Sequence, residues 1–92
     1  LCARRIDRLE SLANNLSNQY GTQILIHPLD VRERSAVESW IASLPESWRN
    51  IYLLLNNAGL ALARDSLQQG IPENWDTMID TNVKGLLYVT RH

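Results

Sequence analysis

The stretch Ile51-Tyr52-Leu53-Leu54-Leu55-Asn56-Asn57-Ala58-Gly59 is the strongest indication of fold class in this sequence. Its first five residues carry no charge, and such a run is typical of a strand buried on both faces of a parallel sheet. The next four residues end the strand, because Gly59 can adopt φ > 0 and the amides can bond neighbouring main chain. The turn would lie at the carboxyl end of a strand, where open α/β sheets hold their ligands. A buried strand that ends in an amide-rich turn without a ligand is the alternative that this stretch leaves open.

The composition is that of an ordinary globular protein of 92 residues, with 45% hydrophobic residues and a formal net charge of −1. A chain of this length forms one domain at most and buries only roughly 60–65% of its unfolded surface. The balanced charge gives no reason to expect nucleic acid or an anionic membrane as a partner. The single cysteine, Cys2, cannot form an internal disulfide, so we expect the cytoplasm and interpret Cys2 as a small buried hydrophobe. His27 has no other ligand at metal-binding spacing, so we expect no metal site.

Apolar residues recur at spacings of three and four in three segments, which predicts three amphipathic helices. The first begins directly after residue 3 and ends at Gly21, the second follows Asp30 to Glu33 and ends at Pro45, and the third begins at Pro72. Strands are expected between them, at residues 1–3, 22–29 and 51–55. This alternation predicts an α/β fold, in which a parallel sheet is covered by helices on both faces through right-handed crossovers.

Three features of the sequence resemble the short-chain dehydrogenases/reductases. They are Asn56-Asn57-Ala58-Gly59 after an apolar strand, an Asp30-Val31 pair after the preceding strand, and Asn82, 26 positions beyond Asn56 in a long helix. Within that family, residues 53–62 and 75–82 are most similar to the NADP-dependent 3-hydroxy acid dehydrogenases. The resemblance runs along the whole chain and implies a partial Rossmann-type doubly wound sheet of three strands and three helices. Residues 1–92 would be an internal fragment of one NAD(P)-binding domain.

The resemblance implies NADP as the cofactor, because Arg4 and Arg5 directly follow a strand with no acid at its tip. In the family, an Arg at this position meets the 2′-phosphate of NADP. A guanidinium matches a phosphate bidentately, whereas an acid would hold the free 2′-hydroxyl of NAD. Arg4 is the better candidate, and a solvated basic helix start is the alternative.

The resemblance also assigns residues to the adenosine end of the cofactor. Asp30 would reach the adenine amino group, and Val31 would pack beside the ring. Asp30-x-x-Glu33 is also a capping-box-like signature, and one carboxylate can serve both roles. Asn56, Ala58 and Gly59 would line the adenosine-ribose side, so a bulky or charged residue at Gly59 is expected to block cofactor binding.

Asn82 is the one residue of this chain to which the resemblance assigns a catalytic role. In the family its main-chain carbonyl, freed by a local break in the helix, holds a water in the proton relay to the active-site lysine. An Asn on the buried stripe of a helix needs a polar partner, so a structural Asn is the alternative. Lys84 is expected to face solvent and is not the family's catalytic lysine.

Two motifs of the family are absent from the sequence. No two of the four glycines are close enough to form the glycine-rich phosphate loop. No tyrosine is followed four residues later by lysine, since these positions after Tyr20, Tyr52 and Tyr88 hold Ile24, Asn56 and His92. The substrate-polarising serine would lie beyond His92. These residues therefore hold the adenosine end and one relay residue, and cannot catalyse hydride transfer alone.

The resemblance implies a parent enzyme that transfers a hydride between NADP and the hydroxyl of a 3-hydroxy acid such as serine. It would be a homo-oligomer, a dimer or tetramer, that acts on a small molecule. A reductase of ketones or 3-ketoacyl thioesters and a non-catalytic nucleotide-binding remnant are the alternatives. In a doubly wound sheet the first strand stands beside the fourth, so residues 51–55 would lack their native neighbours here.

Overall fold

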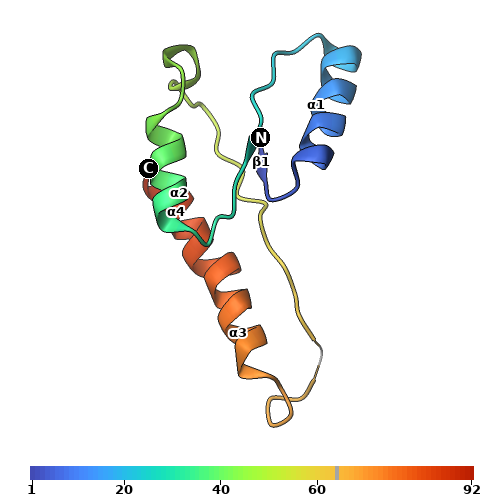
Figure 1. Ribbon diagram of the computed structural model, residues 1–92, viewed down its shortest axis with the longest axis vertical. Coiled ribbons are helices and arrows are strands. Elements are labelled where there is room, and N and C mark those ends of the chain that lie inside the picture. The colour runs from blue at the N-terminus through green and yellow to red at the C-terminus, as the bar shows by residue number, and fades with distance from the viewer. Residues whose placement is uncertain (64) are drawn as a thin grey trace. The chain divides into compact units, whose positions relative to one another are not determined.

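The computed structural model describes residues 1–63 and 65–92, which form two compact units, Leu1–Asp30 and Val31–His92. The first unit contains β-strands and a helix, and the second contains helices and a long connection (Figure 1). Within the described residues no helix is long and apolar enough to cross a membrane. The same residues contain no group of three or more His, Cys, Asp or Glu side chains that could hold a metal ion.

The first unit is a β-α-β arrangement with a parallel strand pair. β1 (Cys2–Ala3) and β2 (His27–Pro28) flank α1 (Ile6–Tyr20), and Cys2 lies opposite His27. The His27 amide donates to the Leu1 carbonyl at 3.0 Å and the Leu29 amide donates to the Ala3 carbonyl at 2.9 Å. Pro28 falls between these two donors, so its missing N–H costs no ladder bond, as expected for a proline in a strand.

The strand expected over residues 22–29 is shorter in the structure, which assigns only His27–Pro28 to β2. Strand pairing needs a partner, and β2 is paired with β1 at Cys2 and Ala3. The helix agrees better with the prediction, since α1 ends at Gly21, whose φ of 62° lies in the left-handed region. The Gly21 amide donates to the Ser17 carbonyl at 2.8 Å, which satisfies one of the terminal acceptors.

The second unit consists mainly of helices. α2 (Arg34–Ala42) is followed by the 3₁₀ turn η1 (Glu46–Trp48). A long helical run then comprises α3 (Pro72–Ile79), the π-helix η2 (Asp80–Gly85) and α4 (Leu86–Arg91), and α2 packs against α4. The predicted start at Pro72 is confirmed, because the proline occupies the first helical turn where no N–H is needed.

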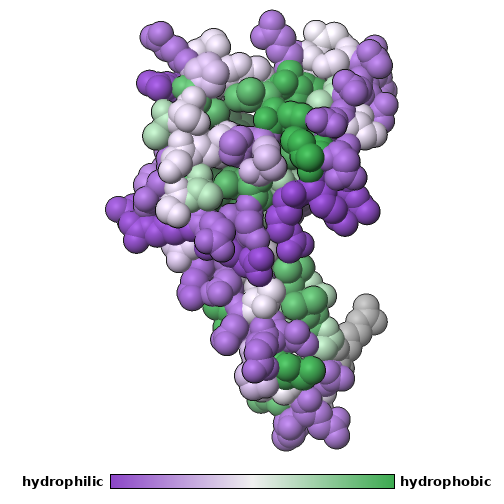
Figure 2. All heavy atoms as spheres, in the orientation of Figure 1, coloured by the Kyte–Doolittle hydropathy of each residue, from purple (hydrophilic) through white to green (hydrophobic). Residues whose placement is uncertain are grey.

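Only a few apolar side chains are buried in either unit. They are Leu9 and Leu29 in the first, and Val37 and Leu44 in the second. Much of the predicted helical stripes remains exposed, and Figure 2 shows apolar side chains on the surface around α3. Ile79 in α3 and Val83 in η2 are each about half exposed. The described residues therefore cover only part of the apolar faces that the sequence provides.

The prediction of a strand at Ile51–Leu55 is wrong for this chain. Residues 51–60 form no strand or helix, and the side chains of Tyr52, Leu53 and Leu55 are 102%, 78% and 80% exposed. The apolar run is intact, but a parallel strand needs neighbours on its edges to satisfy its main chain. The expectation that this run would lack its neighbours is consistent with its irregular, exposed backbone.

We expect the isolated 92-residue chain to self-associate through residues 51–55, because an exposed uncharged apolar run with unpaired main chain is an aggregation site. Light scattering after size-exclusion chromatography should show oligomers rather than the 10.5 kDa monomer. The double variant Leu53→Lys/Leu55→Lys should shift the chain towards the monomer. Leu67→Lys is the matched control, since Leu67 is 77% exposed outside this run. A stable monomer of the unmodified chain with a cooperative unfolding transition would contradict this expectation.

Candidate functional site

The side-chain amide of Asn82 pairs with the main chain of Leu60 in both directions. The Leu60 amide donates to Asn82 Oδ1 at 2.9 Å, and Asn82 Nδ2 donates to the Leu60 carbonyl at 2.8 Å. One carboxamide thereby satisfies a donor and an acceptor that a neighbouring strand would otherwise satisfy. The residue that follows the Asn-Asn-Ala-Gly turn is thus fixed to the long helical run.

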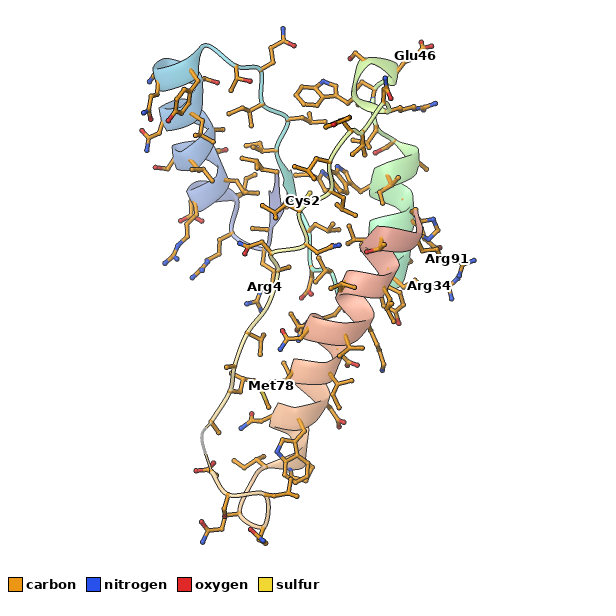
Figure 3. The ribbon with its side chains drawn as sticks, turned by 180° about the vertical axis from the view of Figure 1, so that it is seen from behind. Cys2, Arg4, Arg34, Glu46, Met78 and Arg91 are labelled. Carbon is orange, nitrogen blue, oxygen red and sulfur yellow. The ribbon has the colours of Figure 1, made fainter. Side chains whose placement is uncertain are left out.

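Two further contacts hold the same segment to the same helical run. Asn56 Nδ2 donates to Thr90 Oγ1 at 3.0 Å, and the Leu62 amide donates to Met78 Sδ at 3.4 Å. Figure 3 shows Met78 projecting from α3 towards the connection that precedes it in the chain. Later residues of the segment meet earlier residues of the helical run, so the two lie antiparallel.

Thr90 and Met78 are site residues that sequence reasoning missed. Met78 lies four positions before Asn82, and Thr90 lies eight positions after it. This spacing places polar or polarisable atoms on about one helical face and could have indicated them.

The local break predicted in the helix at Asn82 is present. The π-helix η2 (Asp80–Gly85) interrupts the α-helical bonding, and Asn82 lies inside it. In a π segment the carbonyls bond five residues ahead instead of four, and such interruptions are frequent at functional sites. The expectation that Asn82 lies on the buried stripe is wrong, because the residue is exposed, but its side chain does have a structural role in binding Leu60.

Gly59 lies directly against the Asn82 side chain. A Cβ atom added at Gly59 would meet Asn82 Oδ1 at 3.3 Å, which is tighter than an ordinary van der Waals contact. The positive φ considered for this glycine is not found, since the described glycine with a positive φ is Gly21, and the close approach of the Asn82 side chain is what favours glycine here. Ala58 beside it is exposed.

The candidate residues of the first unit lie at the ends of its strands. Arg4 and Arg5 directly follow β1, and both side chains are exposed, with Arg4 labelled in Figure 3. Asp30 follows the buried Leu29 and is itself half-buried. The capping-box interpretation of Asp30 is wrong, because α2 has Glu33 at its N-cap position and no side-chain cap bond.

Lys84 faces solvent, as expected. Its side chain is 54% exposed, and Nζ lies 2.7 Å from Asp80 Oδ1 one helical turn earlier. The hydrogen bond and charge of Asp80 raise the pKa of Lys84, so its ammonium stays protonated. This lysine therefore forms a surface ion pair and is no proton donor or acceptor at neutral pH.

The first unit defines the class of the fold, a Rossmann-type α/β arrangement with parallel strands joined by a helix. The second unit adds an amide-rich turn held against a π-interrupted helix. The chain belongs to the short chain dehydrogenase family, whose model matches residues 1–92.

Similar proteins carry more specific descriptions. The NADP-dependent 3-hydroxy acid dehydrogenase YdfG of Salmonella typhi is 50% identical over 88 residues, which are 96% of this chain and 34% of that protein. Sulfoacetaldehyde reductase of Chromohalobacter salexigens is 47% identical over 90 residues, 98% of this chain and 35% of that protein. The chain therefore spans about a third of the length of these curated relatives.

Solved structures of serine dehydrogenase match the fold. The crystal structure of the Escherichia coli enzyme has a TM-score of 0.87 at 48% identity, covering 98% of this chain and 39% of that one. The closed form of serine dehydrogenase complexed with NADP⁺ has a TM-score of 0.84 at 48% identity. The match covers 98% of this chain and 35% of that one.

Replacing Asn82 with Ala should release Leu60 from the helical run. Both hydrogen bonds to Leu60 disappear, and a typical hydrogen bond contributes about 1 kcal/mol, so exchange of the Leu60 amide hydrogen should accelerate about tenfold. Hydrogen exchange followed by NMR measures this directly. The Leu62 amide is an internal reference, because it bonds to Met78 instead. Asn74→Ala in α3 is the matched control, and equal acceleration in both variants would show that Asn82 does not clamp Leu60.

Proposed function

We propose that residues 1–92 are an internal segment of the single NAD(P)-binding domain of an NADP-dependent dehydrogenase. The whole enzyme transfers a hydride between the cofactor and the C3 hydroxyl of a 3-hydroxy acid such as serine. One observation carries the proposal. In a chain of this family, Asn82 lies in a π-helix and fixes the segment that follows Asn56-Asn57-Ala58-Gly59. The similarity to 3-hydroxy acid and serine dehydrogenases supports the substrate class.

The residues at the end of β1 fit the chemistry of NADP. Two exposed guanidinium groups, Arg4 and Arg5, follow the strand, and planar guanidinium donors suit a phosphate dianion. No carboxylate stands directly at this strand end to favour a free ribose hydroxyl. We therefore assign Arg4 to the 2′-phosphate, with Arg5 beside it in the sequence.

Asp30, Val31, Asn56, Ala58 and Gly59 are proposed to hold the adenosine half of the cofactor. When bound, NADP would supply the hydride acceptor or donor. A carboxylate can accept from the adenine amino group, and a branched apolar side chain can pack on the ring. The contact of Asn56 with Thr90 supports a fixed position for the start of the turn.

Asn82 is proposed to serve the proton relay through its main-chain carbonyl, which would hold a water molecule. Its side chain binds Leu60, and its main chain lies in the π-helix η2, where the carbonyl partners are shifted. The acid/base that takes the substrate proton is assigned outside these residues, since the sequence has no Tyr-x-x-x-Lys pair. We further propose a cytoplasmic homo-oligomer with a small-molecule substrate.

Reduction of a small aldehyde or ketone is the second candidate function. The similarity to sulfoacetaldehyde reductase favours it, because that name describes reduction of a small carbonyl compound. Assays of the full-length protein with NADP⁺ and serine or 3-hydroxy acids, and with NADPH and carbonyl compounds, separate the two. NADP⁺ reduction with serine supports the first, whereas turnover with carbonyl compounds alone supports the second.

Arg4→Ala should weaken NADP selectively. Loss of a charged bidentate contact costs about 1.5–3 kcal/mol, so the KM for NADP should rise roughly tenfold to a hundredfold while the KM for NAD stays nearly unchanged. Steady-state kinetics of the full-length enzyme with both cofactors measure this. Arg8→Ala is the matched control, an exposed arginine further along α1. An equal rise for NADP and NAD would contradict the assignment of Arg4 to the 2′-phosphate.

A further inference from the structure

Gly85 is a glycine in a helical conformation that alanine would adopt readily. Its φ and ψ are −58° and −44°, and it lies at the end of η2, where α4 begins. Alanine is favoured over glycine by about 1 kcal/mol in a helix interior. The backbone therefore gives no reason for glycine here, and the reason has to be the space around it.

The space around Gly85 is filled by Val31. Gly85 is buried, and a Cβ atom added there would lie 2.6 Å from Val31 Cγ2 and 3.1 Å from Val31 Cβ. The same atom would lie 3.3 Å from the main-chain oxygen of Val31. The contact thus involves the side chain and the backbone of Val31 together.

Val31 has little freedom to move aside. A β-branched side chain is restricted at χ1, and the methyl that would clash is one bond from Cβ, so it cannot swing away like the end of a long chain. Any Cβ at residue 85 would push the side chain and backbone of Val31 away from the helical run. Asp30 is bonded directly to Val31, so the displacement would reach both residues of the Asp30-Val31 pair.

We propose that Gly85 is a positioning residue for cofactor binding, because its missing side chain lets Val31 pack against η2. This packing fixes the position of Asp30 and Val31, the pair proposed to bind the adenosine half. This inference rests on the proposed function for the adenosine role of Val31. The Gly85–Val31 contact itself is independent of that role. Residue 85 would thereby act on the affinity for the adenosine half without touching the cofactor.

The test is a double-mutant cycle in the full-length protein with Gly85→Ala, Val31→Ala and the double variant. Removing the Val31 methyls eliminates the severe 2.6 Å contact and leaves only the milder ones of 3.1 and 3.3 Å to the Val31 Cβ and main-chain oxygen. Two readouts are taken, the midpoint of urea unfolding without ligand and the Kd for 2′,5′-ADP, a probe of the adenosine half alone. Gly85→Ala should lower the unfolding midpoint and weaken 2′,5′-ADP about tenfold, which corresponds to about 1.4 kcal/mol. In the Val31→Ala background the same change should have little effect, or a stabilising one.

Each other outcome overturns part or all of the inference. A stabilised Gly85→Ala variant with unchanged affinity would show that helix propensity alone governs this position. Equal losses in both backgrounds would show that the new Cβ does not act through the Val31 methyl. Coupled unfolding with unchanged 2′,5′-ADP affinity would remove the positioning role. An unmodified protein that does not bind 2′,5′-ADP would overturn the proposed function and the positioning role with it, while the unfolding cycle would still decide the steric contact.

Discussion

The pair of hydrogen bonds between the Asn82 carboxamide and the Leu60 main chain is the constraint on which the second unit depends. Residues 51–60 have no strand partner, so their amides and carbonyls must otherwise be left to solvent. A carboxamide presents one donor side and one acceptor side, as a peptide group does, and can therefore replace one step of a strand pairing. The two bonds to Asn82 hold Leu60, in a segment that belongs to no sheet, in a fixed position beside the helix.

The π-helix places two close contacts in one short segment. η2 (Asp80–Gly85) contains Asn82, which meets Gly59 and Leu60, and Gly85, which meets Val31. An added Cβ would lie 3.3 Å from Asn82 Oδ1 at Gly59 and 2.6 Å from Val31 Cγ2 at Gly85, so the contact at Gly85 restricts a side chain more strongly. The widened turn and the two glycines are therefore parts of one packing arrangement. A change in any of them should disturb the packing of the others.

The sequence predicted the features that depend on local chemistry. The stop at Gly21 and the start at Pro72 follow from the residues at those positions, whereas the break around Asn82 is implied by the family resemblance. The strand at Ile51–Leu55 could not follow, because a strand exists only with a partner and the apolar pattern does not state whether one is present. The partners of Asn82 and Gly85 are equally non-local, since spacing along the chain does not say which main-chain atoms a helix face will meet.

Asn82 has a structural role through its side chain and a proposed chemical role through its main-chain carbonyl. Its side chain is held by Leu60, with the oxygen accepting one bond and the nitrogen donating one, so its position is fixed by the turn. Its main chain lies in the interrupted part of the helix, where carbonyl partners are shifted. A side-chain replacement therefore disturbs the relay only indirectly, by letting the helix and the turn separate. The amide is needed because it holds the turn in place, and the carbonyl would be needed because the helix is broken at that point.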